Sequence, residues 1–439
     1  MLLRYVVSNY KSIGHSMEFS MLPTEKNTDS RFLRTIQTKA GEWKILCRGG
    51  FFGPNASGKT SFIQSVAFAR NYICNGRKSG RGTDVIQFKG DFEDLNGLST
   101  FQFLLFLNGD VFDYGFSINK RQVCEEWLMQ LAKDNFVPVF TRTTDERGIT
   151  MIDVATALGR KNSKERKLAE VLKESVQENQ KNQLFLTKLR ENGVKKAERI
   201  VEWFEDIQII FPESKFIALP LKMKADKDFE TFIAEKLSQL DTGIQSADIE
   251  SEPVDLNEFA EKNHIPDEIL DEITINESGV FRINDQYIIF SPNKQNNTVL
   301  IQLKLRHSLN HKDIKLDIDE ESDGTQRLLN LLPMIFTVGH ENSIYFIDEI
   351  DRSLHTRLSQ YLLSDFIKRA ANGSNQIIFT AHDVNLIDLH LFRQDEIWFI
   401  DKNQAGESKL RIFSDSSGFL LKAKKASAKS FSEYSGCMN

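Results

Sequence analysis

The sequence predicts an α/β fold with a mixed sheet, an antiparallel N-terminal β part and an inserted helical region. Three features of the chain lead to this prediction. Short apolar and aromatic runs fill residues 1–120, an apolar stripe at helical spacing runs from about residue 162 to 204, and apolar runs alternate with helical segments after residue 326. Short continuous apolar runs are typical of parallel strands buried on both faces.

The N-terminal part is expected to contain antiparallel strands. Thr100–Leu107 and Val111–Ile118 are apolar runs joined by Asn108-Gly109-Asp110, whose residue types favour a tight turn. The two runs therefore predict a hairpin. Earlier strands are expected at Tyr5–Val7, Met17–Met21 and Lys44–Phe52.

The middle third is expected to be a mainly helical insertion. Apolar residues from Leu168 to Val176 and from Leu184 to Leu189 have the spacing of a helix face, and Asn192-Gly193 interrupts the pattern. Further helices are expected at Phe229–Leu240 and Pro266–Ile273, and strands at Val280–Ile289 and Val299–Leu305. Buried parallel strands are expected at Ile344–Ile347, Ile377–Phe379 and Ile397–Ile400.

Composition and length restrict the class of protein. The chain has 439 residues, 56 Lys and Arg against 62 Asp and Glu, and a formal net charge of −6. This composition is ordinary for a soluble globular protein, and no apolar run approaches the roughly eighteen residues that cross a membrane. The cysteines form no C-x-x-C pair, which favours structural thiols in a reduced, cytoplasmic setting: Cys47, Cys74, Cys124 and Cys437.

The most specific motif is a phosphate-binding loop, G-x-x-x-x-G-K-T, at Gly53-Pro54-Asn55-Ala56-Ser57-Gly58-Lys59-Thr60, with Ser61 directly after it. Its glycines let the backbone amides face a phosphate, while Lys59 offsets phosphate charge and Thr60 offers a hydroxyl to Mg²⁺. The expected strand before the loop and helix after it make a purely structural glycine-rich turn the lesser alternative. The motif therefore predicts a nucleotide, and ATP with Mg²⁺ is the expected cofactor pair.

A second motif is an apolar strand that ends in two acids, Ile344 to Glu349. Asp348 can hold Mg²⁺ through its water shell, and Glu349 can orient or deprotonate an attacking water. Alone, such a pair is more often a solvated strand end. Together with the phosphate loop it predicts the catalytic acids.

Two weaker motifs stand at ordered distances from these acids. Ser322 and Gly324 open an apolar helix, and His382 follows the strand expected to end at Thr380. A hydroxyl and backbone amides at the start of a helix can donate hydrogen bonds to a γ-phosphate. A histidine at the end of a strand can contact the same phosphate. A helix cap and a surface histidine explain each of them equally well when taken singly.

The four motifs and the opening YVVSNYKSI resemble a known family. The chain resembles ATP-binding-cassette-type ATPases of the group containing the SMC proteins, RecF and the zinc-hook DNA-repair ATPases. It is more similar to the AAA-type ATPase subunits of the RloA/AbiL and OLD-like phage-defence systems. The strings that carry the resemblance are GPNASGKTSFIQS, ESDGTQRLL, IDEIDRSLH and FTAHD.

The resemblance implies an ABC-type ATPase core and a role for each matching residue. Lys59 and Thr60 become the Walker A pair, Asp348 the Walker B acid, Glu349 the catalytic base and His382 the switch histidine. Ser322 and Gly324 become the signature, which reaches the nucleotide of a second subunit. The chain departs from the transporter pattern at Asp323, Thr325 and His355, and the candidates for a Q-loop glutamine are Gln102 and Gln130.

The same resemblance implies the domain layout and the partners. The ATPase domain is expected in two parts, residues 1–130 and 316–439, separated by a mainly helical insertion at 131–315 that returns to strands. The chain is expected to form a homodimer or higher homo-oligomer around ATP. It would sense or gate a separately encoded effector, a nuclease or a toxin, in prokaryotic antiviral defence. Its expected activity is Mg-dependent ATP hydrolysis.

The sequence leaves two alternative functions open. A RecF-like DNA-repair clamp is the second hypothesis, and a transporter's nucleotide-binding subunit is the third. The insertion carries opposed charges: residues 160–199 hold twelve Lys or Arg against six acids, and residues 241–277 hold twelve acids against Lys262. The basic stretch leaves nucleic acid open as a partner, although a charged helical face is more often simply solvated.

Overall fold

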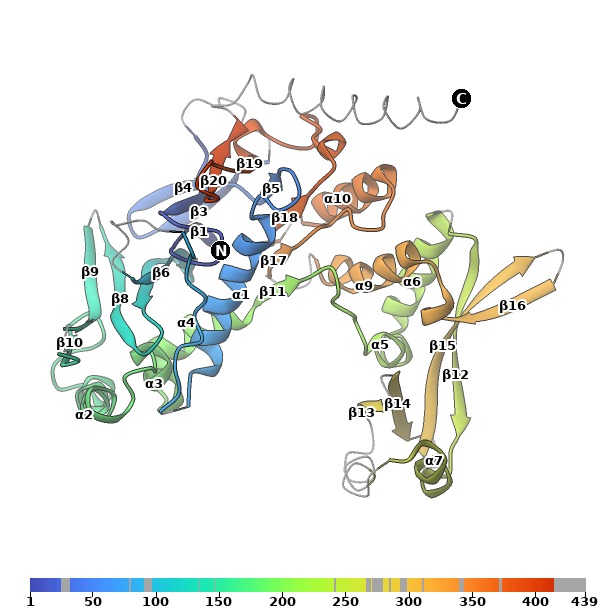
Figure 1. Cartoon of the computed structure of the whole chain (residues 1–439), viewed down its shortest axis with the longest axis horizontal. Coiled ribbons are helices and arrows are strands. Elements are labelled where there is room, and N and C mark those ends of the chain that lie inside the picture. The colour runs from blue at the N-terminus through green and yellow to red at the C-terminus, as the bar shows by residue number, and fades with distance from the viewer. Residues whose placement is uncertain are drawn as a thin grey trace. The chain divides into compact units, whose positions relative to one another are not determined.

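The chain divides into two compact units in the computed structural model (Figure 1). Unit 1 comprises Met1–Pro212, Gly339–Asp351 and Ile367–Asn439, and unit 2 comprises Glu213–Val338 and Arg352–Phe366. The structure describes residues 1–24, 32–78, 80–90, 97–133, 135–145, 147–240, 242–265, 270, 279–283, 286–292, 298–309, 312–338, 343–370 and 373–413.

Unit 1 contains a seven-stranded antiparallel sheet in the order β10-β9-β8-β7-β6-β1-β2. The predicted hairpin is confirmed: β6 pairs with β7, and Asn108 and Gly109 turn between them with φ of 52° and 87°. Glycine and asparagine tolerate this left-handed backbone better than other residues do. The strands are β1 (Leu2–Ser8), β2 (Met17–Ser20), β6 (Ser99–Leu107), β7 (Asp110–Ile118), β8 (Val123–Ala132), β9 (Asn135–Thr144) and β10 (Thr150–Val154).

A second sheet of unit 1 has six strands in the order β11-β17-β18-β5-β19-β20. All its neighbours are parallel except the pair β19–β20. The prediction of buried parallel strands is confirmed, since every residue of β17 and β18 and the first four residues of β19 are buried. The strands are β5 (Arg48–Phe52), β11 (Ile207–Ile210), β17 (Ile344–Ile347), β18 (Gln376–Ala381), β19 (Ile397–Lys402) and β20 (Ser408–Ile412).

One strand prediction in unit 1 is wrong in its extent. The expected strand Lys44–Phe52 is two strands, because β4 (Gly41–Ile45) pairs with β3 (Arg34–Thr38) in a separate ribbon before β5 begins. The apolar run continues through Leu46 and Cys47, but the backbone changes sheets there. A continuous apolar pattern shows burial and does not show which strand pairs with which.

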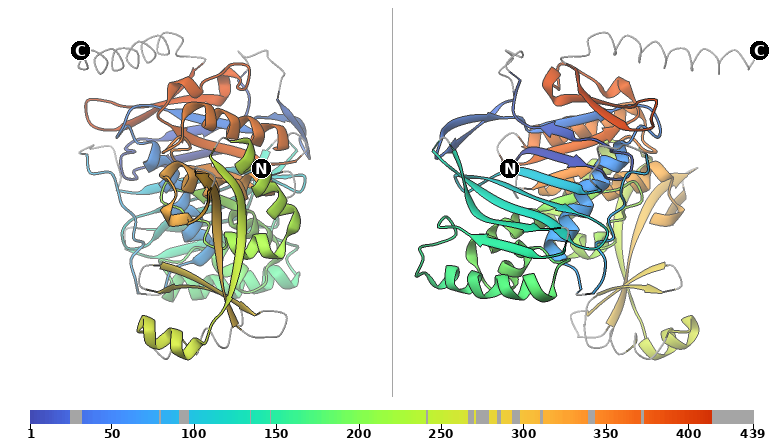
Figure 2. Two further views of the ribbon diagram at one scale, coloured as in Figure 1. Left: turned by 90° about the vertical axis from the view of Figure 1, so that its right-hand side faces the viewer. Right: turned by 60° about the vertical axis from the view of Figure 1, so that its left-hand side comes forward.

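The helix α1 (Lys59–Asn75) joins the two sheets of unit 1 into one core. The ring of Phe62 lies 5.6 Å from that of Tyr5 on β1 and 4.6 Å from that of Phe51 on β5. Figures 1 and 2 show this helix, in blue, running alongside the antiparallel strands. Each fully buried aromatic ring contributes about 1.5–3 kcal/mol to stability, so the helix that follows the phosphate loop is firmly held.

The helices predicted between residues 162 and 204 are present. They are α2 (Lys164–Asn179), α3 (Phe185–Glu191) and α4 (Lys195–Glu205), and Gly193 breaks the pattern between the last two with φ of 77°. Within the described residues, no helix is long and apolar enough to cross a membrane. Cys74 and Cys124 are buried free thiols and Cys47 is half-buried, while Cys437 lies outside the described residues.

Unit 2 combines helices with a sheet in the order β12-β15-β14-β13, to which β16 adds on β15. The insertion returns to strands as expected, but the strand predicted at Val280–Ile289 is two strands, β13 and β14, which pair with each other. The α/β class is confirmed. The helix predicted at Pro266–Ile273 lies outside the described residues except for Leu270. The strands are β12 (Ile244–Pro253), β13 (Gly279–Ile283), β14 (Gln286–Pro292), β15 (Thr298–Leu309) and β16 (Lys312–Asp317).

The helices of unit 2 pack at both ends of its long strands. At one end, Phe229 and Phe232 of α6 lie 4.9 Å and 5.4 Å from the ring of Phe336 on α9. At the other end, Phe259 of α7 lies 5.5 Å from the ring of Phe290 on β14. The helices are α5 (Leu219–Ala225), α6 (Lys227–Gln239), α7 (Leu256–Asn263), η1 (Ile318–Glu320) and α9 (Asp323–Thr337), and α10 (Thr356–Ala370) begins in unit 2 and ends in unit 1.

Candidate functional site

The phosphate loop runs from the end of β5 to the start of α1, and two of its glycines are required by space. A Cβ on Gly53 would lie 2.1 Å from the carbonyl oxygen of Ile400, and one on Gly58 would lie 2.0 Å from the hydroxyl oxygen of Ser408. Gly58 also has φ of 111°. The backbone of β19 and the Ser408 side chain of β20 therefore pack directly against the curled loop.

Lys59 is buried, and its ammonium is held inside the loop. It donates to the carbonyl oxygens of Gly53 at 2.7 Å and Pro54 at 3.0 Å, and it lies 3.2 Å from Nδ1 of His382. Burial lowers the pKa of Lys59 to about 8, although nearby acids oppose this shift. A phosphate bound beside Lys59 would favour the ammonium and raise this pKa again.

Nucleotide binding is expected to take up a proton at Lys59. Phosphates favour the ammonium and raise its pKa, so affinity should fall as the pH rises above about 8 and net proton uptake should be larger at about pH 9 than at about pH 7. Calorimetric titrations in two buffers of different ionisation enthalpy measure this uptake. The variant Lys59→Arg cannot lose its charge and should show no such increase. Equal uptake by the two proteins would contradict the assignment.

Asp348 and Thr60 meet at the foot of the loop. Asp348 is fully buried at the end of β17, and its carboxylate accepts hydrogen bonds from Thr380 at 2.7 Å and from Thr60. Burial raises the pKa of Asp348, and these two hydrogen bonds work against that rise. Among the described residues no cluster of three or more His, Cys, Asp or Glu side chains could hold a metal by itself. A hydroxyl beside one carboxylate fits Mg²⁺, which takes its other ligands from phosphates and water.

Glu349 and His382 form a contact beside this pair. Nε2 of His382 lies 3.1 Å from Oε1 of Glu349, and both side chains are partly exposed. Because Lys59 can only donate to Nδ1 of His382, the proton of the neutral ring belongs on Nε2 and is shared with Glu349. Glu349 also has φ of 47°, a strained backbone for a non-glycine residue.

Thr380 is a residue of the candidate site that the motifs did not reveal. Its fully buried hydroxyl donates to Asp348 at 2.7 Å and accepts the backbone N–H of Glu349 at 2.8 Å. Thr380 thus fixes both acids, including the strained backbone of Glu349. A threonine inside an apolar strand is too common to single out, but its place two residues before His382 on the neighbouring strand is a usable signal.

Replacing Thr380 by Val is expected to destabilise the site. The backbone N–H of Glu349 loses its acceptor and Asp348 loses one of its two donors, which costs about 1–3 kcal/mol in the free energy of unfolding. Thr380→Ser keeps the hydroxyl and should retain most of this stability. Urea unfolding without nucleotide compares the two variants, and equal transition midpoints would show that the hydroxyl does not hold the acids.

The predicted signature lies in unit 2, whereas Lys59, Asp348, Glu349 and His382 come together in unit 1. Ser322 is the N-cap of α9, accepting the backbone N–H of Thr325 at 3.2 Å and lying 3.0 Å from that residue's hydroxyl. A Cβ on Gly324 would lie 2.8 Å from the carbonyl oxygen of Ser353. Asp323 is exposed, and Nδ1 of His355 accepts the backbone N–H of Arg357 at 3.3 Å. The contact of this segment with a second subunit stays a prediction.

Both glutamine candidates lie on the antiparallel sheet. Gln102 donates to the two oxygens of Asp113, each at 2.9 Å. Gln130 donates to Asp110 at 2.9 Å and accepts from Lys196 at 2.8 Å. These hydrogen bonds give each glutamine a role within the sheet, and the Q-loop assignment stays a prediction.

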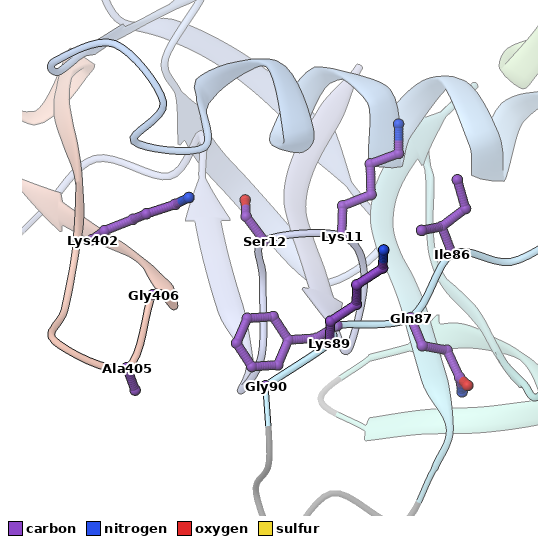
Figure 3. Close-up of a pocket in the computed structure, with 10 residues that line it drawn as sticks. Lys11, Ser12, Ile86, Gln87, Lys89, Gly90, Lys402, Ala405 and Gly406 are labelled. Atoms are coloured by element: carbon purple, nitrogen blue, oxygen red, sulfur yellow. The ribbon is translucent and has the colours of Figure 1, made fainter.

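A hollow of about 500 Å³ lies beside the phosphate loop. Ser408 connects the hollow to the phosphate loop. Its hydroxyl donates to the carbonyl of Ser57 at 2.7 Å and lies 2.8 Å from the hydroxyl of Ser12, a residue that lines the hollow. Figure 3 shows Lys402 extending toward Ser12, with Lys11 and Lys89 on the opposite side. None of the described residues that line it is acidic. The hollow draws on three distant segments, so no sequence motif marks it.

Comparison with solved structures finds SMC heads. The SMC head bound to the C-winged helix domain of ScpA has a TM-score of 0.43 and 13% identity, covering 93% of this chain and 96% of that chain. The SMC head domain from Thermotoga maritima has a TM-score of 0.40 and 12% identity, covering 94% and 98%. The Smc head with an extended coiled coil, bound to the C-terminal domain of ScpA derived from Pyrococcus furiosus, has a TM-score of 0.37 and 14% identity, covering 97% and 99%. No curated protein matches the chain.

A family model assigns the chain to a protein family, which the low TM-scores of the solved structures do not. It describes an AAA domain, putative AbiEii toxin, Type IV TA system, and it matches residues 50–388, which is most of the chain. The match begins just before the phosphate loop and ends just after His382. The chain therefore belongs to this family of AAA domains.

Proposed function

We propose that the chain binds ATP with Mg²⁺ and hydrolyses it. The observation that supports this most is the convergence of Lys59, Asp348, Glu349 and His382 at one phosphate loop, although up to 323 residues separate the contacting pairs. Thr60 and Asp348 would hold Mg²⁺, whose charge would polarise the phosphates. The Lys59 ammonium would exchange its hydrogen bonds to the carbonyls of Gly53 and Pro54 for hydrogen bonds to β- and γ-phosphate oxygens.

Glu349 is proposed as the base that takes a proton from the attacking water. In the resting arrangement its carboxylate is engaged by His382, which also contacts Lys59. Movement of Lys59 to the phosphates removes one partner of His382 and lets the imidazole turn toward the γ-phosphate. Nucleotide binding and release of the base would then be one event.

We further propose that the site is completed by a second copy of the chain. Ser322 and Gly324 would bring a hydroxyl and backbone amides to the partner's γ-phosphate, where the start of α9 favours negative charge. Purified chain with ATP and Mg²⁺ should release phosphate at a rate per chain that increases with protein concentration. A constant rate per chain would exclude the dimeric site, and no phosphate release at any concentration would exclude hydrolysis.

The hollow beside the loop is proposed to receive the ribose and base end of the nucleotide. Lys11→Ala is expected to weaken ATP binding about tenfold, because one hydrogen bond to a charged group is lost, while tripolyphosphate binding stays unchanged. Competition titrations with a fluorescent nucleotide measure both affinities. Lys44→Ala, at an exposed lysine of β4, serves as the control. Equal losses for ATP and tripolyphosphate would place Lys11 at the phosphates instead.

The biological setting proposed is antiviral defence in a prokaryote, with ATP turnover gating a separately encoded effector. The description of the family, which names a putative toxin, supports this setting. Isolation of the chain from its native host should yield a nuclease or toxin bound to it. Stimulation of hydrolysis by DNA ends, with no such companion, would favour the RecF-like clamp.

A further inference from the structure

Asp351 ties the end of β17 to the segment that carries His382. Its Oδ2 accepts the backbone N–H of His382 at 2.9 Å and that of Asp383 at 2.8 Å. These hydrogen bonds join residues that are 31 and 32 positions apart in the chain. Because their acceptor is a carboxylate, they are about twice as strong as hydrogen bonds between neutral groups. The backbone of His382 is therefore anchored by an acid two residues beyond Glu349.

The other oxygen of Asp351 is unusual. Oδ1 is buried and has no hydrogen-bond partner among the described residues. A buried carboxylate oxygen without a partner costs free energy, which the two bonds to Oδ2 offset. Of the acids around Lys59, Asp351 does most to oppose the lowering of that lysine's pKa, ahead of Glu349 and Asp348. The side chain therefore belongs to the electrostatic surroundings of the phosphate loop.

We propose that Asp351 is a positioning residue for the switch histidine. By holding the backbone of His382 and Asp383, it sets the imidazole where one nitrogen meets Lys59 and the other meets Glu349. Without it, the segment after β18 loses two hydrogen bonds to the end of the acid-bearing strand. The inference rests on the proposed ATP hydrolysis for its effect on rate, but its structural content can be measured without nucleotide.

Hydrogen exchange of the nucleotide-free full chain, followed by mass spectrometry, tests the anchoring directly. In Asp351→Ala, exchange of the His382 and Asp383 amides should speed up at least about tenfold, since each loses its acceptor. In Asp351→Asn the amide oxygen still accepts both bonds, and exchange should stay near the wild-type rate. Asp388→Ala is the matched control, because Asp388 makes the same kind of bond to the backbone of His390, at 2.8 Å, in a later turn.

Kinetics then separate positioning from folding. Asp351→Ala should lower kcat about 100-fold, as expected for a misplaced catalytic group, while KM changes less than about threefold. Asp351→Asn should keep at least a tenth of the wild-type kcat, and Asp388→Ala should match wild type. If Asp351→Asn keeps slow exchange and is as inactive as Asp351→Ala, the side chain acts in the chemistry and positioning is overturned.

The two proposals fail in different ways. If the wild-type chain releases no phosphate, ATP hydrolysis is excluded, and the exchange rates still decide whether Asp351 anchors His382. If the wild type hydrolyses ATP and Asp351→Ala leaves exchange and kcat unchanged, the positioning role is wrong and the ATPase stands. If Asp351→Ala fails to fold, amide exchange and kcat of Asp351→Asn are compared with those of Asp388→Ala. Slow exchange with lost activity in Asp351→Asn would then overturn the positioning role.

Discussion

Glu349→Gln is expected to lower kcat for ATP by about 100- to 10,000-fold, the contribution typical of a general base. Glutamine has the same shape and can still accept a hydrogen bond from His382 through its amide oxygen, but it cannot take a proton from water. ATP should therefore bind and remain intact. The trapped nucleotide should hold two chains together, which light scattering during gel filtration would detect.

The control for this variant is Glu42→Gln, at an exposed position of β4. It should hydrolyse ATP at the wild-type rate and show no ATP-dependent dimer. If Glu349→Gln also turns over ATP at the wild-type rate, another group is the base and the contact with His382 has a different purpose. If turnover stops but no dimer accumulates, the shared site between two copies is wrong.

Lys59→Ala is expected to weaken ATP binding at least about 100-fold, because the charge-assisted hydrogen bonds to two phosphate groups are lost together. The loss of stability should be small. The ammonium is buried with a pKa lowered to about 8, so the folded chain already bears a cost for holding that charge. Equilibrium binding of a fluorescent ATP analogue measures the affinity.

The matched control for this loss is Lys44→Ala, which removes an exposed lysine of β4 and should leave affinity unchanged. Thermal unfolding of the two variants verifies that both remain folded. Retention of wild-type affinity by Lys59→Ala would mean that the loop binds no phosphate. The convergence of Asp348, Glu349 and His382 would then need another ligand to explain it.

Particular elements show how far the sequence reaches. The hairpin β6–β7 and the buried strands β17, β18 and β19 are as predicted, since local turn chemistry and continuous burial leave a direct pattern in the residues. The strand predicted at Lys44–Phe52 is split, because β4 and β5 belong to different sheets. The error lies in strand pairing, which depends on residues far away in the chain.

The phosphate loop and the acid pair can be recognised from the sequence, because their chemistry requires particular residue types at short, fixed spacing. The side chains that hold these groups in place are recognisable only in the folded chain. Thr380 fastens both acids, and Asp351 fastens the backbone of His382. The hollow lined by Lys11, Ser12, Lys89 and Lys402 likewise forms only when distant segments meet. Residues on neighbouring strands can form a hydrogen bond at any separation along the chain. Such partners therefore have no characteristic spacing in the sequence.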